Sequence, residues 1–152
     1  MDMQIKDYKI CESLRRLFFS IVFLFMTMCI QAKTYYFSSY NLYTCEEDKY
    51  LQSGHQKTFA KVSIDEKKKK VLLSLYDTGN KKWYNFPLTI KNKAVLDKGI
   101  IAYNIINNVY AEGRSYVYVS FYRDGGLFID VAAFNFQGDE ISVWMQGPYK
   151  IE

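Results

Sequence analysis

Short hydrophobic runs recur along the chain after residue 32, and apolar and polar positions alternate in most of them. The run Ala60-Lys61-Val62-Ser63-Ile64 shows this period of two, which is typical of a strand with one buried face. Clusters of Gly, Asn and Asp between the runs predict turns. Eight strands are predicted, at Thr34 to Tyr40, Thr58 to Ile64, Lys70 to Tyr76, Lys82 to Ile90, Gly99 to Ile106, Ser115 to Tyr122, Gly126 to Phe136 and Glu140 to Gln146.

The connections between the predicted strands are mostly short, which favours antiparallel neighbours. We therefore predict an all-β single domain, an antiparallel meander that closes into an up-and-down barrel or a barrel-like sandwich. Closure would also protect the edges of so aromatic a sheet. A further short strand at Val109 to Glu112 is possible, because Asn107-Asn108 suits the turn of a tight hairpin.

One segment departs from the strand pattern. Thr44 can cap a helix, and Glu47, three residues later, can complete a capping box. Gly54 suits the left-handed residue that follows a helix end. The sequence therefore predicts one short helix between Thr44 and Gly54.

The chain begins with the pattern of a secretory signal peptide. Arg15 and Arg16 precede an apolar run of 14 residues, Leu17 to Ile30, and Ala32 offers a small residue for cleavage. The run is shorter than the roughly 20 residues of a membrane-spanning helix, so an uncleaved anchor is the weaker alternative. We expect residues 1–32 to be removed, residues 33–152 to form the domain, and the protein to be secreted or periplasmic without an integral membrane span.

Composition excludes several classes of function for residues 33–152. The residues before Lys33 include four basic and three acidic side chains, so their removal lowers the net charge from +4 to +3, too little to indicate a nucleic-acid partner. Cys45 and His55 are then the only cysteine and the only histidine. One residue of each kind is too few for a zinc site, and we expect no metal and no cofactor.

Turn chemistry sets a register for the last three predicted strands, and the register defines two faces. A loop at Arg123-Asp124-Gly125 pairs Phe121 with Leu127, and a loop at Gln137-Gly138-Asp139 pairs Asn135 with Ile141. One face is then almost purely aliphatic and is predicted to be core. Its members are Val117, Val119, Phe121, Leu127, Ile129, Val131, Ala133, Ile141, Val143 and Met145.

The opposite face mixes aromatic rings with a few hydrogen-bonding groups, as surfaces that bind a sugar, a peptide or a partner protein do. Its predicted binding residues are Tyr116, Tyr118, Tyr122, Phe128, Asp130, Phe134 and Trp144. In the alternative interpretation, the predicted short helix and the segment Lys33 to Gln56 half cover this face, and the tyrosines pack against them with only their hydroxyls in water.

Two small constellations offer catalytic chemistry. Asp77-Thr78-Gly79 is similar to the core triplet of aspartic proteases, which implies a catalytic carboxylate acting within a dimer; Asn80 departs from that family's preference for a small residue. Asp, Gly and Asn at these positions also suit a plain hairpin turn. Cys45 and His55 are the other candidates, as a nucleophile and its base.

We expect a secreted, non-catalytic binding or interaction protein that uses the aromatic face, with a protein, peptide or carbohydrate as ligand. The alternatives are a small hydrolase acting through Asp77 or the Cys45 and His55 pair, and a barrel that carries a small hydrophobic ligand with the tyrosine-rich face turned inward.

Overall fold

A computed structural model describes residues 32–46, 49–112, 115–136 and 139–151. The chain divides into two compact units, residues 1–31 and residues 32–152, and the description below concerns the second. The predicted signal peptide, residues 1–32, lies outside the described residues apart from Ala32.

Antiparallel strands make up nearly all of the second unit, so the prediction of an all-β fold is confirmed. The strands are β1 (Lys33–Phe37), β2 (Tyr40–Glu46), β3 (Lys49–Gln56), β4 (Ala60–Asp65), β5 (Lys70–Asp77), β6 (Lys82–Val95), β7 (Ile101–Ile106), β8 (Ser115–Phe121), β9 (Leu127–Phe136), β10 (Asp139–Gly147) and β11 (Lys150–Ile151). The eight predicted strands correspond to β1 and to β4 through β10. One 3-10 turn, at Asp97–Gly99, separates β6 from β7. Residues Val109 to Glu112 form a turn rather than the possible extra strand.

The prediction of a helix between Thr44 and Gly54 is wrong. This segment belongs to the β2–β3 hairpin, in which Thr44 pairs with Leu51 and Cys45 pairs with Tyr50. Strand β2 also pairs with β10, nearly 100 residues further along the chain, placing Leu42 opposite Val143. A capping box stabilises an isolated helix only weakly, and the pairing of β2 on both edges outweighs it.

The described residues form one sheet of 11 strands with the order β11-β1-β4-β5-β6-β7-β8-β9-β10-β2-β3. The sheet is not closed, so the predicted barrel closure is wrong. Closure of the predicted meander needs β10 to pair with β1, but the β2–β3 hairpin occupies that edge of β10. Beyond Gly147 and Pro148, the short β11 pairs with β1 through two residues only, Lys150 and Ile151.

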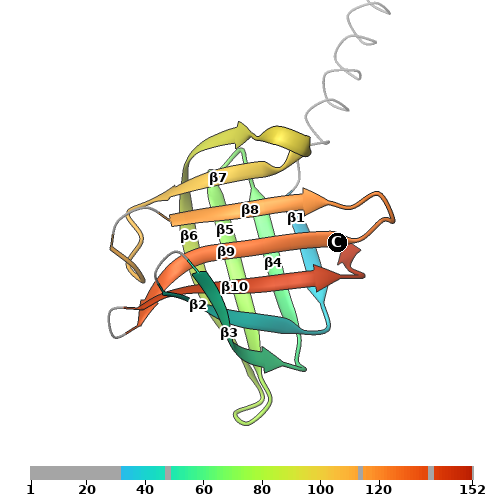
Figure 1. Ribbon diagram of the computed structural model, residues 1–152, viewed down its shortest axis with the longest axis vertical. Helices are drawn as coiled ribbons and strands as arrows, with labels where there is room; N and C mark the ends of the chain where they lie inside the picture. Colours follow the sequence, from blue (N-terminus) through green and yellow to red (C-terminus); the bar gives the residue numbers. More distant parts are fainter. Residues whose placement is uncertain (1–31, 47–48, 113–114, 137–138, 152) are drawn as a thin grey trace, which may run out of the picture. The chain divides into compact units, whose positions relative to one another are not determined.

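The sheet bends over itself and forms two facing layers. In Figure 1, β8, β9 and β10 run across the view in front of β4, β5 and β6, which run nearly vertically. Alternate side chains from both layers meet between them and form the core, which includes Val62, Leu73, Val117, Ile129 and Met145. Strand alternation therefore leaves the other side of β8, β9 and β10 facing away from the core.

The predicted aliphatic face is confirmed for most of its residues. Those that are buried in the core are Val117, Val119, Leu127, Ile129, Val131, Ala133, Val143 and Met145. Ile141 is half-buried, and Phe121 at the end of β8 is 50% exposed. The predicted pairing of Phe121 with Leu127 is also found.

The register predicted between β9 and β10 is wrong, by one residue near their shared turn and by two residues beyond a β-bulge. Asn135 pairs with Glu140 rather than with Ile141, and Ile141 pairs with Phe134. A β-bulge follows, after which Ser142 pairs with Ala132. An extra residue in one strand reverses the side to which the residues beyond it point. Phe134 therefore lies on the core side, whereas Trp144 keeps its predicted side.

Candidate functional site

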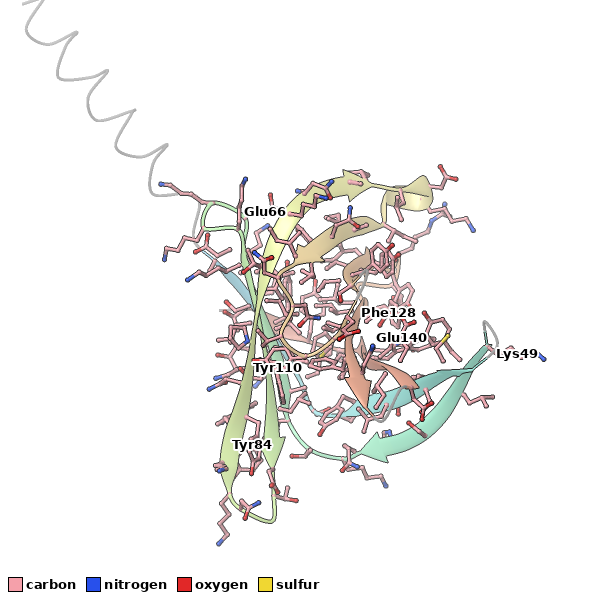
Figure 2. All side chains as sticks on the ribbon, turned by 90° about the vertical axis from the view of Figure 1, so that its left-hand side faces the viewer. Lys49, Glu66, Tyr84, Tyr110, Phe128 and Glu140 are labelled. Atoms are coloured by element: carbon pink, nitrogen blue, oxygen red, sulfur yellow. The ribbon has the colours of Figure 1, made fainter. Side chains whose placement is uncertain are left out.

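The aromatic side of β8, β9 and β10 continues onto the β2–β3 hairpin. Register places Tyr118 and Trp144 on either side of Asp130, and Ser142 opposite Tyr43. Figure 2 shows Phe128 and Glu140 on the side toward which the hairpin end at Lys49 projects. We call this surface the aromatic sheet face; it comprises Tyr43, Tyr50, Tyr116, Tyr118, Phe128, Asp130, Ser142 and Trp144.

Trp144 is the centre of this face and is packed by three rings. Tyr43 stacks on it with a centroid distance of 3.8 Å, and Phe128 meets it edge-on at 5.4 Å. The Tyr50 ring lies 5.6 Å away at a tilt of 49°. These contacts hold Trp144 in one orientation, so that it supports the face more than it contacts solvent.

The rings with the most accessible surface lie around this centre. Tyr50 is 45% exposed, and Tyr116 and Tyr118 are half-buried. The planes of Tyr116 and Tyr118 lie within 10° of each other, with their centroids 5.6 Å apart. Two flat rings side by side on a sheet give a ligand a rigid surface on which to stack.

A cluster of buried polar atoms lies beneath these rings. Asp130 is only 7% exposed and Ser142 is fully buried. Ser142 and Trp144 act as hydrogen-bond donors toward the Asp130 carboxyl, but within the part of the chain that the structure describes, Asp130 Oδ1, Ser142 Oγ and Trp144 Nε1 make no hydrogen bond of ordinary distance and angle. Buried polar atoms of a folded protein are nearly always well paired, so this loosely bonded cluster is unusual.

Burial raises the pKa of the Asp130 carboxyl to about 7. Hydrogen bonding from the Ser142 and Trp144 side chains offsets part of the rise in pKa, and the negative charge of Glu140 adds a smaller rise. Burial also raises the pKa of the Tyr50 and Tyr118 hydroxyls, and the charge of Asp130 contributes to both shifts. Both hydroxyls therefore stay protonated at neutral pH and remain able to donate hydrogen bonds.

The structure brings together five of the seven residues predicted for the binding face: Tyr116, Tyr118, Phe128, Asp130 and Trp144. Tyr122 is at the end of β8, beside the turn that its backbone closes with Gly126. Phe134 is not part of the face, because the β9 bulge turns it toward the core, where its ring lies 5.3 Å from that of Phe86.

Sequence reasoning missed Tyr43 and Tyr50, because it assigned their segment to a helix or its flank. The signal was present in the alternation of Tyr40-Asn41-Leu42-Tyr43, which suits a strand with Leu42 inward and Tyr43 outward. The pairing of Tyr43 with Ser142, which lies far along the chain, could not be predicted from local sequence.

Asp77 serves a hairpin turn. Its Oδ1 accepts hydrogen bonds from the backbone N–H groups of Gly79, at 2.8 Å, and Asn80, at 3.2 Å. Its Oδ2 accepts a bond of 2.6 Å from Asn80 Nδ2. Hydrogen bonds from Asn80, and then from Gly79, lower the pKa of the Asp77 carboxyl. The contacts of Asp77 are therefore those of a turn residue, as the hairpin interpretation of Asp77-Thr78-Gly79 predicts.

Cys45 and His55 are not brought together. Cys45 pairs with Tyr50, whereas His55 pairs with Asn41, four residues away along β2. That spacing corresponds to about 13 Å along a strand. His55 Nδ1 instead lies 2.6 Å from Asn41 Oδ1.

Among the described residues, no group of three or more His, Cys, Asp or Glu is placed to hold a metal ion. No helix within residues 32–151, as far as they are described, is long and apolar enough to cross a membrane. Comparisons with protein families, curated proteins and solved structures found no match for this chain. A function can therefore be inferred only from the site itself.

Proposed function

We propose that this protein is a non-catalytic binding protein whose aromatic sheet face recognises carbohydrate. The observation that carries the proposal is the row of accessible tyrosine rings on a rigid sheet, above a buried and incompletely bonded polar cluster. Tyr50, Tyr116 and Tyr118 offer flat apolar surface and hydroxyl groups together. A sugar ring presents the matching combination of apolar C–H faces and hydroxyls.

The division of side chains between the two faces favours a sugar over a protein partner. Valine, isoleucine and leucine of β8 and β9 point into the core, and no residue of these types belongs to the aromatic sheet face. The centre of a protein interface is usually more apolar than this surface. A protein or peptide ligand remains the second outcome of the test below.

The test is affinity electrophoresis of residues 33–152 in gels that contain soluble glucans, mannans or xylans. We expect at least one polysaccharide to retard the protein, and Tyr118→Ala and Tyr50→Ala to weaken binding about 30-fold each, which corresponds to about 2 kcal/mol. Retention of a folded circular dichroism spectrum separates this loss from unfolding.

Phe121→Ala is the matched control, because Phe121 is a 50% exposed ring at the end of β8 that pairs with Leu127 and lies outside the face. It should bind as the wild type does. Equal retardation of the Phe121 and Tyr118 variants, or no retardation by any polysaccharide, would reject carbohydrate as the ligand. Peptide-library capture that depends on Tyr118 would then indicate a peptide ligand.

We also propose that the binding domain is exported and begins at Lys33. This rests on the sequence pattern of residues 1–32, with Arg15 and Arg16 before the apolar run and Ala32 after it. The intact mass of exported protein is expected to equal that of residues 33–152. A mass that includes Leu17 to Ile30 would show a retained anchor instead.

A further inference from the structure

A hollow lies on the core side of the sheet and shares no residue with the aromatic sheet face. It has a volume of about 460 Å³, and its walls are formed by Leu42, Leu75, Phe86, Tyr110, Phe134, Ile141 and Val143, with Asn135 beside them. Volumes of this size are typical of small-molecule sites. Its lining includes residues of both layers, from β5 and β6 in one and from β9 and β10 in the other.

Two structural features keep this hollow open. The β9 bulge turns Phe134 inward, and its ring packs against Phe86 at 5.3 Å and Tyr110 at 5.8 Å. The loop that carries Tyr110 is fixed to β9, because Asn135 N donates to Tyr110 O at 3.0 Å and Asn108 Nδ2 donates to Ala133 O at 2.7 Å. The walls are therefore preformed.

A polar hollow of about 330 Å³ adjoins the apolar one, and the two share Leu75 and Phe86. The polar side chains of its lining are Tyr40, Gln56, Thr58, Tyr76, Asp77, Thr78 and Tyr84. The only charged group among them, Asp77, already accepts three bonds from Gly79 and Asn80 and has Lys82 as its strand partner. Thr58 Oγ1 donates to Tyr76 O at 3.1 Å, so the tyrosine hydroxyls, the Thr78 hydroxyl and the Gln56 amide are the main groups available to a ligand.

We propose that the paired hollows bind a neutral amphipathic molecule, with a hydrocarbon chain in the apolar part and a hydroxylated, uncharged head in the polar part. The apolar walls exclude a fully polar ligand, because its hydrogen bonds would be lost without replacement. An anionic head is disfavoured by the adjacent Asp77 carboxylate. That carboxylate attracts a cationic head only weakly, because the hydrogen bonds from Gly79 and Asn80 and the charge of Lys82 already compensate it. Long-chain alcohols, diols and monoacylglycerols have the required chemistry.

The experiment is an amide-shift NMR titration of residues 33–152 at pH 8 with glycerol monooctanoate below its micelle concentration, beside octanoate and glycerol. We expect saturable shifts at Leu75, Phe86, Phe134 and Ile141, at least fivefold weaker binding of octanoate, and no shifts with glycerol. Shifts confined to the aromatic sheet face, or equal binding of octanoate, would overturn the proposal.

Ile141→Trp fills the apolar hollow and should weaken binding of glycerol monooctanoate at least tenfold. Val95→Trp is the control, because Val95 is 69% exposed on β6 and should leave binding unchanged. Leu75→Trp replaces Ile141→Trp if that variant does not fold. Unchanged binding of glycerol monooctanoate by the variant with the filled hollow would overturn the proposal. Sedimentation that shows a dimer of the wild type but not of Ile141→Trp would also overturn it, because a second copy of the chain would then occupy the hollow.

Discussion

Replacing Asp130 by asparagine is expected to raise the free energy of unfolding by up to about 4 kcal/mol at pH 8. The Asp130 carboxyl has its pKa raised from 3.8 to about 7 by burial. A shift of about three pKa units corresponds to about 4 kcal/mol, which the folded state loses when the carboxyl is ionised. Asparagine has nearly the same shape and carries no charge, so it avoids this loss.

The same shift fixes the pH dependence of wild-type stability. Because the folded-state pKa lies above the unfolded value, the folded state binds more protons between pH 4 and pH 7. The stabilisation from protonated Asp130 is therefore complete below about pH 4 and is lost as the pH rises to about 7. Glu66 has the opposite effect on stability, because hydrogen bonds from Lys93 and Tyr103 lower the pKa of its carboxyl. The stabilisation that it contributes is therefore lost as the pH falls.

Urea unfolding of the wild type and Asp130→Asn at pH 5, 6, 7 and 8 tests this expectation. The two proteins should differ by about 1.5 kcal/mol at pH 5, because the loss begins near pH 4, and by more toward pH 8. Glu140→Gln is the control, because Glu140 is an exposed carboxylate near the same face, and surface substitutions usually change stability by less than about 0.5 kcal/mol. A gap between wild type and Asp130→Asn that does not grow with pH would contradict the assignment.

A buried carboxyl that weakens the fold at neutral pH is typical of a functional position rather than of packing. Asp130 lies between Tyr118 and Trp144 across the strands, and its carboxyl is only loosely hydrogen-bonded by the Ser142 and Trp144 side chains. Its charge also acts on Tyr50 and Tyr118, two of the three rings proposed to contact ligand. A ligand hydrogen-bonded to these hydroxyls would therefore sense the protonation state of Asp130.

Local sequence was sufficient where turn chemistry and alternation agreed. In the β8–β9 hairpin, Gly125 adopts a φ of 84°, Tyr122 N donates to Gly126 O, and Phe121 pairs with Leu127 as predicted. Because strand side chains alternate, that one register was enough to separate core from outer face along β8 and along β9 as far as its bulge.

Long-range pairing and a bulge account for what local sequence could not predict. The segment of β2 and β3 is extended because β2 pairs with the edge of β10. This pairing stacks Tyr43 on Trp144 and prevents closure of the barrel. The bulge in β9 follows from the ladder as a whole, and it moved Phe134 from the predicted site into the apolar hollow. Neither feature has a marker within a few residues of sequence.

Cutting Ile129 to alanine is expected to destabilise the protein by about 3–4 kcal/mol, whereas Tyr118→Ala should cost about 1 kcal/mol. Ile129 is fully buried on the core side of β9, so its removal leaves a cavity between the two layers. Tyr118 is half-buried on the opposite side and packs mainly against Tyr116, so the gap it leaves opens to solvent.

Thermal and urea unfolding of both variants separates a binding surface from a second packed surface. Val119→Ala is the control on β8 itself, because Val119 is the sequence neighbour of Tyr118 and is buried in the core. It should be more destabilising than Tyr118→Ala although it removes far fewer atoms. Large and similar losses of unfolding free energy for Tyr118→Ala and Ile129→Ala would mean that the tyrosines are needed for folding. The proposal that the aromatic sheet face is a ligand site would then be rejected.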